Sequence, residues 1–193
     1  MSLDTALAWT SRAAVKSHLK ISATDLDDEI DLKINAASKL LETYIGHSIK
    51  AGSFTEFYDG DGTNMLLLGN YPVLSIAGIW VDGVRVFGDD KLVDPAAYAF
   101  DANESENVGT VRLLSGCFGR GVQNVKVQYM AGFSEVPYDA ELSCIQLVAW
   151  LLNRAGTEGQ TSASLGGKSE TYELDAIPAY IKRGVAKYRK GCA

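Results

Sequence analysis

The stretch Pro137–Ala155, PYDAELSCIQLVAWLLNRA, decides the fold. Most of its residues are apolar, and they cover too wide an arc of a helix to be buried on one side only. The proline at its start suits the first position of a helix. The stretch therefore predicts a central helix, packed by other helices, by a sheet or by a neighbouring subunit.

A basic segment follows this helix. After a loop rich in glycine and serine, residues 156–169, a short helix is expected beyond Pro178, and it carries five cations and no acid. The cations are Lys182, Arg183, Lys187, Arg189 and Lys190. This pattern is more typical of an assembly subunit than of an enzyme.

The net charge of −6 is unevenly distributed along the chain. Residues 177–193 contribute +5, so the other 176 residues, with 13 basic and 24 acidic side chains, carry −11. An acidic body repels the phosphate backbone and disfavours tight binding of nucleic acid. The basic helix is therefore expected either to touch DNA or to dock in an acidic protein groove.

Two helices are expected ahead of the central one. The first spans residues 4–19 and has a modest apolar stripe. The second spans residues 26–45 and ends at Gly46, a natural stop. Its apolar residues recur every three or four positions, which indicates an amphipathic helix: Leu26, Ile30, Ile34, Ala37, Leu41, Tyr44 and Ile45.

The middle of the chain, residues 54–130, alternates between apolar and polar residues and predicts antiparallel strands. Two hairpins are expected, one around Asp59–Gly62 and one that pairs residues 79–81 with 84–86 around Asp82-Gly83. Further strands are expected at 108–114 and 122–130, with an irregular excursion at 89–107.

The predicted fold is α+β. A helical bundle is formed by the two N-terminal helices, the central apolar helix and the short C-terminal helix, and an antiparallel β region is inserted into it. The expected domains are residues 1–53, residues 54–132 and residues 133–193, with the last completing the bundle begun by the first.

No catalytic, cofactor or metal site is expected. Gly166–Ser169 resembles the end of a P-loop, but the first glycine is replaced by Ser162 and a helix precedes the motif. Asp59–Asn64 resembles the start of a calcium loop, yet it lacks the glycine and glutamate that an EF-hand needs. The two histidines, His18 and His47, have no metal or nucleophile spacing around them.

Three cysteines at wide spacing predict neither a disulfide framework nor a zinc site. No apolar run approaches the roughly 18 residues of a membrane helix, and the first residues lack the layout of a signal peptide. No membrane association is expected, and the protein is expected in the cytoplasm of the cell that makes it.

Four phrases, in order, carry a resemblance to a known family. They are LKINAASKLLETYIGHSI (32–49), VKVQYMAGFSEVPYDAELSCIQLVAWLLNR (125–154), GGKSETYE (166–173) and IPAYIKRGVAKYRKG (177–191). Their order resembles the head–tail connector proteins of tailed bacteriophages and prophages, also called adaptor or head-completion proteins. The β-rich middle is larger than in the compact helical members of that family.

The resemblance implies a non-enzymatic subunit of the virion neck, assembled in the bacterial host. Such subunits form a ring, usually of twelve copies, between the portal protein and a downstream neck or tail-completion protein, and DNA passes through the channel without specific binding. A tail-completion or stopper protein of the neck is the alternative, and a small hydrolase or ligand-binding domain is a more distant one.

Two sets of contact residues are expected, the first from the resemblance and the second from the apolar sequence of the central helix. Portal docking falls on Lys168, Ser169, Glu170, Thr171, Tyr172, Lys182, Arg183, Lys187, Arg189 and Lys190. The central helix offers apolar surface for packing between subunits: Ile145, Val148, Trp150, Leu151 and Leu152.

Overall fold

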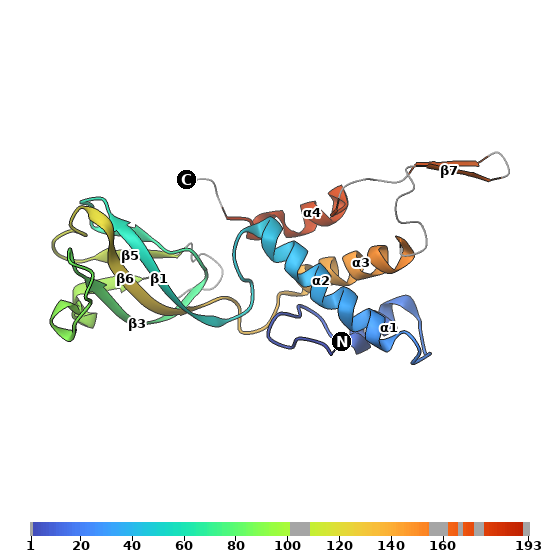
Figure 1. The fold of residues 1–193 in the computed structure, drawn as a ribbon, viewed down its shortest axis with the longest axis horizontal. Helices are drawn as coiled ribbons and strands as arrows, with labels where there is room; N and C mark the ends of the chain where they lie inside the picture. The colour runs from blue at the N-terminus through green and yellow to red at the C-terminus, as the bar shows by residue number, and fades with distance from the viewer. Residues whose placement is uncertain (1, 101–108, 155–161, 166–167, 172–175, 191–193) are drawn as a thin grey trace. The chain divides into compact units, whose positions relative to one another are not determined.

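The computed structural model describes residues 2–100, 109–154, 162–165, 168–171 and 176–190. Within these residues the chain is α+β, with four α-helices and antiparallel sheets, and the predicted fold class is confirmed at that level. The chain divides into two compact units (Figure 1). A helical unit comprises residues 1–46 and 136–193, and a β unit comprises residues 47–135.

The helical unit is built around its third helix. α3 contacts each of the other three helices, and α2 packs along it (Figure 1). A 3-10 turn, η3 (Ala186–Tyr188), continues the last helix. The helices are α1 (Arg12–Leu19), α2 (Asp27–Ile45), α3 (Tyr138–Arg154) and α4 (Ala179–Val185).

The second helix follows its sequence pattern closely. Its fully buried apolar residues recur every three or four positions, so one stripe faces the other helices. Gly46, with φ +88°, ends the helix in the left-handed conformation that glycine adopts without strain. The buried stripe consists of Ile30, Ile34, Ala37, Leu41 and Ile45.

The first helix is shorter than predicted, because it begins at Arg12 and not at residue 4. Asp4 closes a separate turn, in which its carbonyl accepts from the N–H of Ala8 at 2.8 Å. The Ser11 hydroxyl then accepts from the N–H of Ala14 at 3.2 Å and caps the helix proper. Both residues are of the type that compete with helical hydrogen bonds, which explains the late start.

The β unit consists of two three-stranded antiparallel sheets, with strand orders β1-β6-β3 and β2-β5-β4. Side chains from both sheets form one hydrophobic core, in which Leu68, Val111, Ile79 and Val127 are fully buried. The strands are β1 (Gly52–Gly60), β2 (Met65–Leu67), β3 (Val73–Val81), β4 (Tyr98–Phe100), β5 (Thr110–Leu113) and β6 (Gly121–Ala131).

Neither predicted hairpin of this region is present. β1 pairs with β6 and β2 pairs with β5, so Asp59–Gly62 connects two sheets. Residues 84–86 form no strand, because the buried Asp82 carboxylate accepts from the N–H groups of the residues that follow it. A side chain that binds the backbone locally offers it an alternative to the β-ladder.

The irregular excursion at 89–107 contains, in its described part, two 3-10 helices and a short strand. η1 (Asp89–Lys91) and η2 (Pro95–Ala97) precede β4, which pairs with β5. The sequence pattern missed β4 because the strand has only three residues.

A polar cluster lies on the inward side of β1. The Glu56 carboxylate accepts hydrogen bonds from the hydroxyls of Tyr58 and Tyr129, and from the Asn70 amide at 3.0 Å. Burial, together with these bonds to Glu56, raises the pKa of both tyrosines. The cluster joins β1, β6 and the connection before β3, and so fixes the first sheet.

The glycine- and serine-rich stretch predicted as a loop at 156–169 contains strands. β7 (Ser162–Leu165) pairs with β8 (Lys168–Thr171) in antiparallel register. Ser162 lies opposite Thr171, and Leu165 lies opposite Lys168. The loop prediction was therefore wrong for the described residues of this stretch.

Candidate assembly surfaces

The C-terminal segment is anchored in the helical unit by apolar side chains. Ile181 and Val185 are fully buried, one turn apart on α4, and Ile177 is 6% exposed just before the helix. α4 lies so close to α3 that a Cβ at Gly184 would be 2.6 Å from the Ser143 hydroxyl. This segment is therefore part of the helical core, and its basic residues occupy the remaining faces.

One of these cations binds the body of the same unit. The Lys187 ammonium lies 2.8 Å from the Asp139 carboxylate at the start of α3, and the Tyr188 hydroxyl donates to the same carboxylate at 2.7 Å. Partial burial would raise the pKa of Asp139, but the bonds from Lys187 and Tyr188 outweigh it and lower that pKa. Asp139 is thus ionised and holds the end of the chain in place.

The last described residues bind the end of α2. The Arg189 guanidinium lies over the Tyr44 ring at 5.5 Å, and the Lys190 N–H donates to the Ile45 carbonyl at 2.7 Å. Arg183 is exposed and Lys182 is half-buried. Of the predicted basic docking residues, three therefore also make contacts that hold the helical unit together.

The other predicted docking residues belong to the hairpin. Lys168, Ser169, Glu170 and Thr171 form β8, and Tyr172 lies outside the described residues. Among the described strands, β7 and β8 pair only with each other, so each has one edge without a strand neighbour. An open edge can accept a strand from another chain.

The predicted subunit-packing residues separate into two groups on α3. Ile145 and Val148 are buried within their own chain, whereas Trp150, Leu151 and Leu152 are half-buried. The Arg154 guanidinium lies over the Trp150 ring at 4.6 Å. The second group therefore retains apolar surface that another subunit can cover.

The same helix exposes two residues that the sequence reading did not select. Tyr138 is 88% exposed and Leu142 is 46% exposed, one turn apart at the start of α3. Their spacing of four residues is that of one helix face. Because most residues of the helix are apolar, the sequence could not show which apolar face is exposed and which is buried.

The β unit carries an apolar loop tip that sequence reasoning missed. In the loop after β3, Val84 is 81% exposed and Val86 is 77% exposed. The sequence pattern predicts a strand at both residues, paired with a neighbouring strand. The large exposure became visible only once the structure placed them in a loop.

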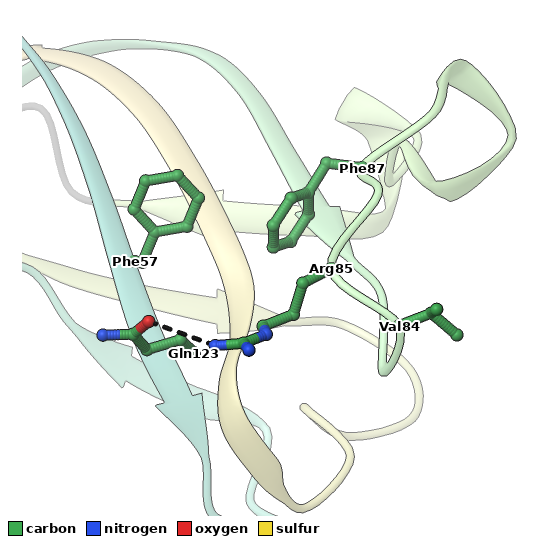
Figure 2. A pocket seen from close by; sticks show the side chains of 5 residues that line it. All are labelled: Phe57, Val84, Arg85, Phe87 and Gln123. Atoms are coloured by element: carbon green, nitrogen blue, oxygen red, sulfur yellow. Dashed lines mark hydrogen bonds between the residues drawn. The ribbon is translucent and has the colours of Figure 1, made fainter.

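A shallow hollow of about 360 Å³ lies beneath this tip. Figure 2 shows Phe57 and Phe87 facing each other across it, Arg85 reaching towards Gln123, and Val84 pointing away. The two rings are 5.5 Å apart, and the Arg85 guanidinium donates to the Gln123 side chain at 3.3 Å. The ring contact and the hydrogen bond hold the loop against the sheet, and the tip of the loop stays exposed to solvent.

The described residues place three of the motifs considered in the sequence in local structural roles. They contain no group of three or more metal-ligating side chains. His47 stacks on Tyr71 at 4.2 Å, and the Asp61 carboxylate accepts from the Thr63 N–H at 2.8 Å within a turn. Lys168 begins a strand, where a P-loop would require a helix.

No described helix is both long enough and apolar enough to cross a membrane.

The model of a family described as "Head completion protein" matches residues 8–191. No curated protein matches the chain.

Two solved structures have a similar fold. One is the neck of an empty gene transfer agent (GTA) particle computed with C6 symmetry, with a TM-score of 0.66, 15% identity, and coverage of 100% of this chain and 96% of that chain. The other is the neck of a native GTA particle computed with C12 symmetry, with a TM-score of 0.62, 15% identity, and coverage of 98% and 91%. At this identity the likeness concerns the fold.

Proposed function

The chain belongs to the head completion protein family, and from this premise we propose that it is a non-enzymatic ring subunit of a virion neck. The ring lies between the portal protein and a downstream neck or tail-completion protein. It extends the DNA channel, and the acidic body of the chain lets DNA pass without specific binding. Assembly takes place in the cytoplasm of the bacterial host.

The family match carries this proposal, and the fold likeness to necks of phage-like particles supports a ring. One of those necks was computed with C12 symmetry, so we propose twelve copies in the particle. A ring requires two different surfaces on each subunit, which meet head to tail and close by rotation. On the helical unit, the last turn of α3 with the half-buried Trp150, Leu151 and Leu152 supplies one of them, and the buried Ile145 and Val148 lie one to two turns earlier on the same helix.

The portal-facing surface is proposed to combine residues 168–172, of which 168–171 form β8, with the basic end of the chain. Arg183 is exposed on α4, and Lys190 is exposed one residue after Arg189. Lys182 and Lys187 lie on the same segment. Five cations without an acid suit an acidic groove on the portal and favour rapid association.

Deleting the basic segment would be a poor test, because the deletion also removes the buried Ile181 and Val185. The sharper test is the double variant Arg183→Glu with Lys190→Glu, which leaves the core intact. We expect it to keep its melting temperature and to lose at least tenfold in affinity for the cognate portal ring, measured by light scattering or surface plasmon resonance.

Lys39→Glu on α2 is the matched control, because its side chain is 70% exposed and lies outside the proposed docking surface. It should bind the portal like the original chain. If the double variant also binds normally, the anchor lies elsewhere. If the original chain binds no portal and forms no ring, the proposed function is wrong.

A further inference from the structure

The loop after β3 forms a fixed knob, defined here as residues 83–87. The Asp82 carboxylate accepts from the N–H groups of Val84 at 2.9 Å, Val86 at 2.8 Å and Phe87 at 3.0 Å. These bonds, that to Val84 first, lower the pKa of Asp82, so the carboxylate is ionised at neutral pH. The loop is therefore held in one shape in the free chain.

The knob is costly for the chain to build. Arg85 and Phe87 have φ values of +62° and +56°, a region that residues other than glycine rarely adopt. Such backbone persists only where the surroundings fix it, and it is concentrated at functional sites. This strained backbone conformation exposes the side chains of Val84 and Val86. Arg85 is the only charged residue of the knob.

A second surface of the same unit complements the knob. A hollow of about 530 Å³, here called the acidic hollow, lies over β2 and the turn before it. Its apolar part includes Met65 and Leu67, which are 49% and 47% exposed. Asp59 and Asp61 supply two carboxylates to its lining, and Arg112 supplies a guanidinium. A second guanidinium, that of Arg120, donates to the Asp61 carbonyl at 3.1 Å.

The two surfaces match in chemistry and are lined by different residues among those described. They adjoin at one point, where the Gln123 N–H donates to the Asp59 carboxylate at 2.6 Å. Two exposed valines with an arginine between them suit exposed Met and Leu side chains bordered by carboxylates. Two different, complementary surfaces on one chain are what a head-to-tail contact between copies needs.

We propose that the knob of one copy inserts into the acidic hollow of the adjacent copy. Val84 and Val86 then pack on Met65 and Leu67, and Arg85 faces Asp59 and Asp61. This inference rests on the proposed ring and deepens it, because it makes the inserted β unit a second belt of contacts between subunits. The larger β-rich middle of this chain thereby acquires a role in assembly.

Crosslinking between copies tests the contact directly. In a background with Cys117→Ser and Cys192→Ser, one preparation carries Val86→Cys and another carries Leu67→Cys. Cys144 stays in place, because it is buried and burial raises its thiol pKa to about 12. The two preparations are mixed, assembled in solution or on the portal, and oxidised.

We expect disulfide-linked pairs only in the mixture, and a ladder of multimers when one chain carries both changes. Rings seen by electron microscopy without any mixed pair would overturn the contact and leave the proposed function standing. Efficient pairing of Val86→Cys with itself would show a symmetric contact and would also overturn it. A chain that forms no ring in solution or on the portal overturns both proposals.

A charge in the knob provides the independent test. Val84→Asp should reduce ring formation at least tenfold at equal concentration, with an unchanged melting temperature. Leu114→Asp is the matched control, since Leu114 is 66% exposed and lies outside the knob and the acidic hollow; it should assemble normally. Normal ring assembly by Val84→Asp would contradict the proposal. If that variant assembles normally but no longer binds a downstream neck protein, the knob is a contact for that partner.

Discussion

The helical unit and the β unit differ in how the structure places the residues that stand out in the sequence. In the helical unit, the basic residues that dominate the sequence partly serve the fold, because Lys187 binds Asp139 and Arg189 lies over Tyr44. In the β unit, apolar residues that read as part of a strand are exposed at a loop tip, with Val84 81% exposed. Charge that is conspicuous in the sequence thus partly serves contacts within the chain, whereas the exposure of the apolar residues can be read only from the structure.

The two units also differ in what fixes their candidate surfaces. The basic segment is held by buried apolar side chains such as Ile181, so its position depends on the helical core. The backbone of the knob is held by one carboxylate, that of Asp82, and its side chains add the contacts of Phe87 with Phe57 and of Arg85 with Gln123. Mutations should therefore damage the first surface through global stability and the second through local order.

The largest effect is expected from Ile181→Ala. The side chain is fully buried, and truncation of such a residue costs about 2–5 kcal/mol in free energy of unfolding. Urea denaturation measures the loss. Val84→Ala in the β unit is the comparison, and it should stay within about 0.5 kcal/mol of the original chain, because its side chain is exposed. Equal losses in the two variants would remove the contrast between the units.

Asp31→Asn should follow, with a loss of about 1.5–3 kcal/mol in stability, the usual contribution of hydrogen bonds to a charged group. Asp31 is 1% exposed and accepts two hydrogen bonds from the Arg12 guanidinium. Thermal melts at neutral pH measure the change. A stability equal to that of the original chain would show that the pair contributes nothing.

The same pair predicts a pH dependence. The hydrogen bond from Arg12 lowers the pKa of Asp31 below its usual value of 3.8. The carboxylate therefore stabilises the fold above that usual value, and the stabilisation disappears as the pH falls through the lower pKa of the folded state. The Asn variant should lose less stability between neutral pH and pH 3 than the original chain does.

Asp82→Asn should lower stability less than Asp31→Asn and act mainly on the knob, since an amide offers one acceptor oxygen where the carboxylate offers two. Amide exchange at Val86 and Phe87 should become faster, while exchange in β6 stays slow. Asp94→Asn is the control, because Asp94 accepts from only one N–H group, that of Ala96. Unchanged exchange at the knob would mean that Asp82 does not hold it.

The smallest effect is expected from Asp139→Asn. Asp139 is partly exposed, and exposed ion pairs contribute about 0.2–1 kcal/mol. The end of the chain should loosen, which faster amide exchange at Lys190 would report. Arg183→Ala, on the exposed side of α4, should leave that exchange unchanged. If the two variants behave alike, the salt bridge does not anchor the segment.

The sequence predicted the second, third and fourth helices well, because burial in a helix follows a local period; the first begins at Arg12, eight residues later than predicted. The stripe from Ile30 to Ile45 and the stop at Gly46 could be read directly. The strands at β1, β5 and β6 were also found from alternation. Their pairing was not, because pairing in this unit is non-local: β1 lies beside β6, more than sixty residues further along the chain.

The candidate surfaces were only partly predictable, for a related reason. Val84 and Val86 alternate with other residues as a strand does, and the pattern cannot show that Asp82 uses its carboxylate to bind the following backbone. Likewise the charge of Lys187 is visible in the sequence, but its partner Asp139 is far away along the chain. Exposure and pairing both depend on the three-dimensional fold.

Copies of this chain are proposed to close into a ring. The direct measurement is the mass of the purified protein in solution over a range of concentrations, with electron microscopy of the same fractions, with and without the cognate portal. We predict closed rings with a central channel under at least one of these conditions. A chain that stays monomeric in both, with no ring on the portal, would contradict the account.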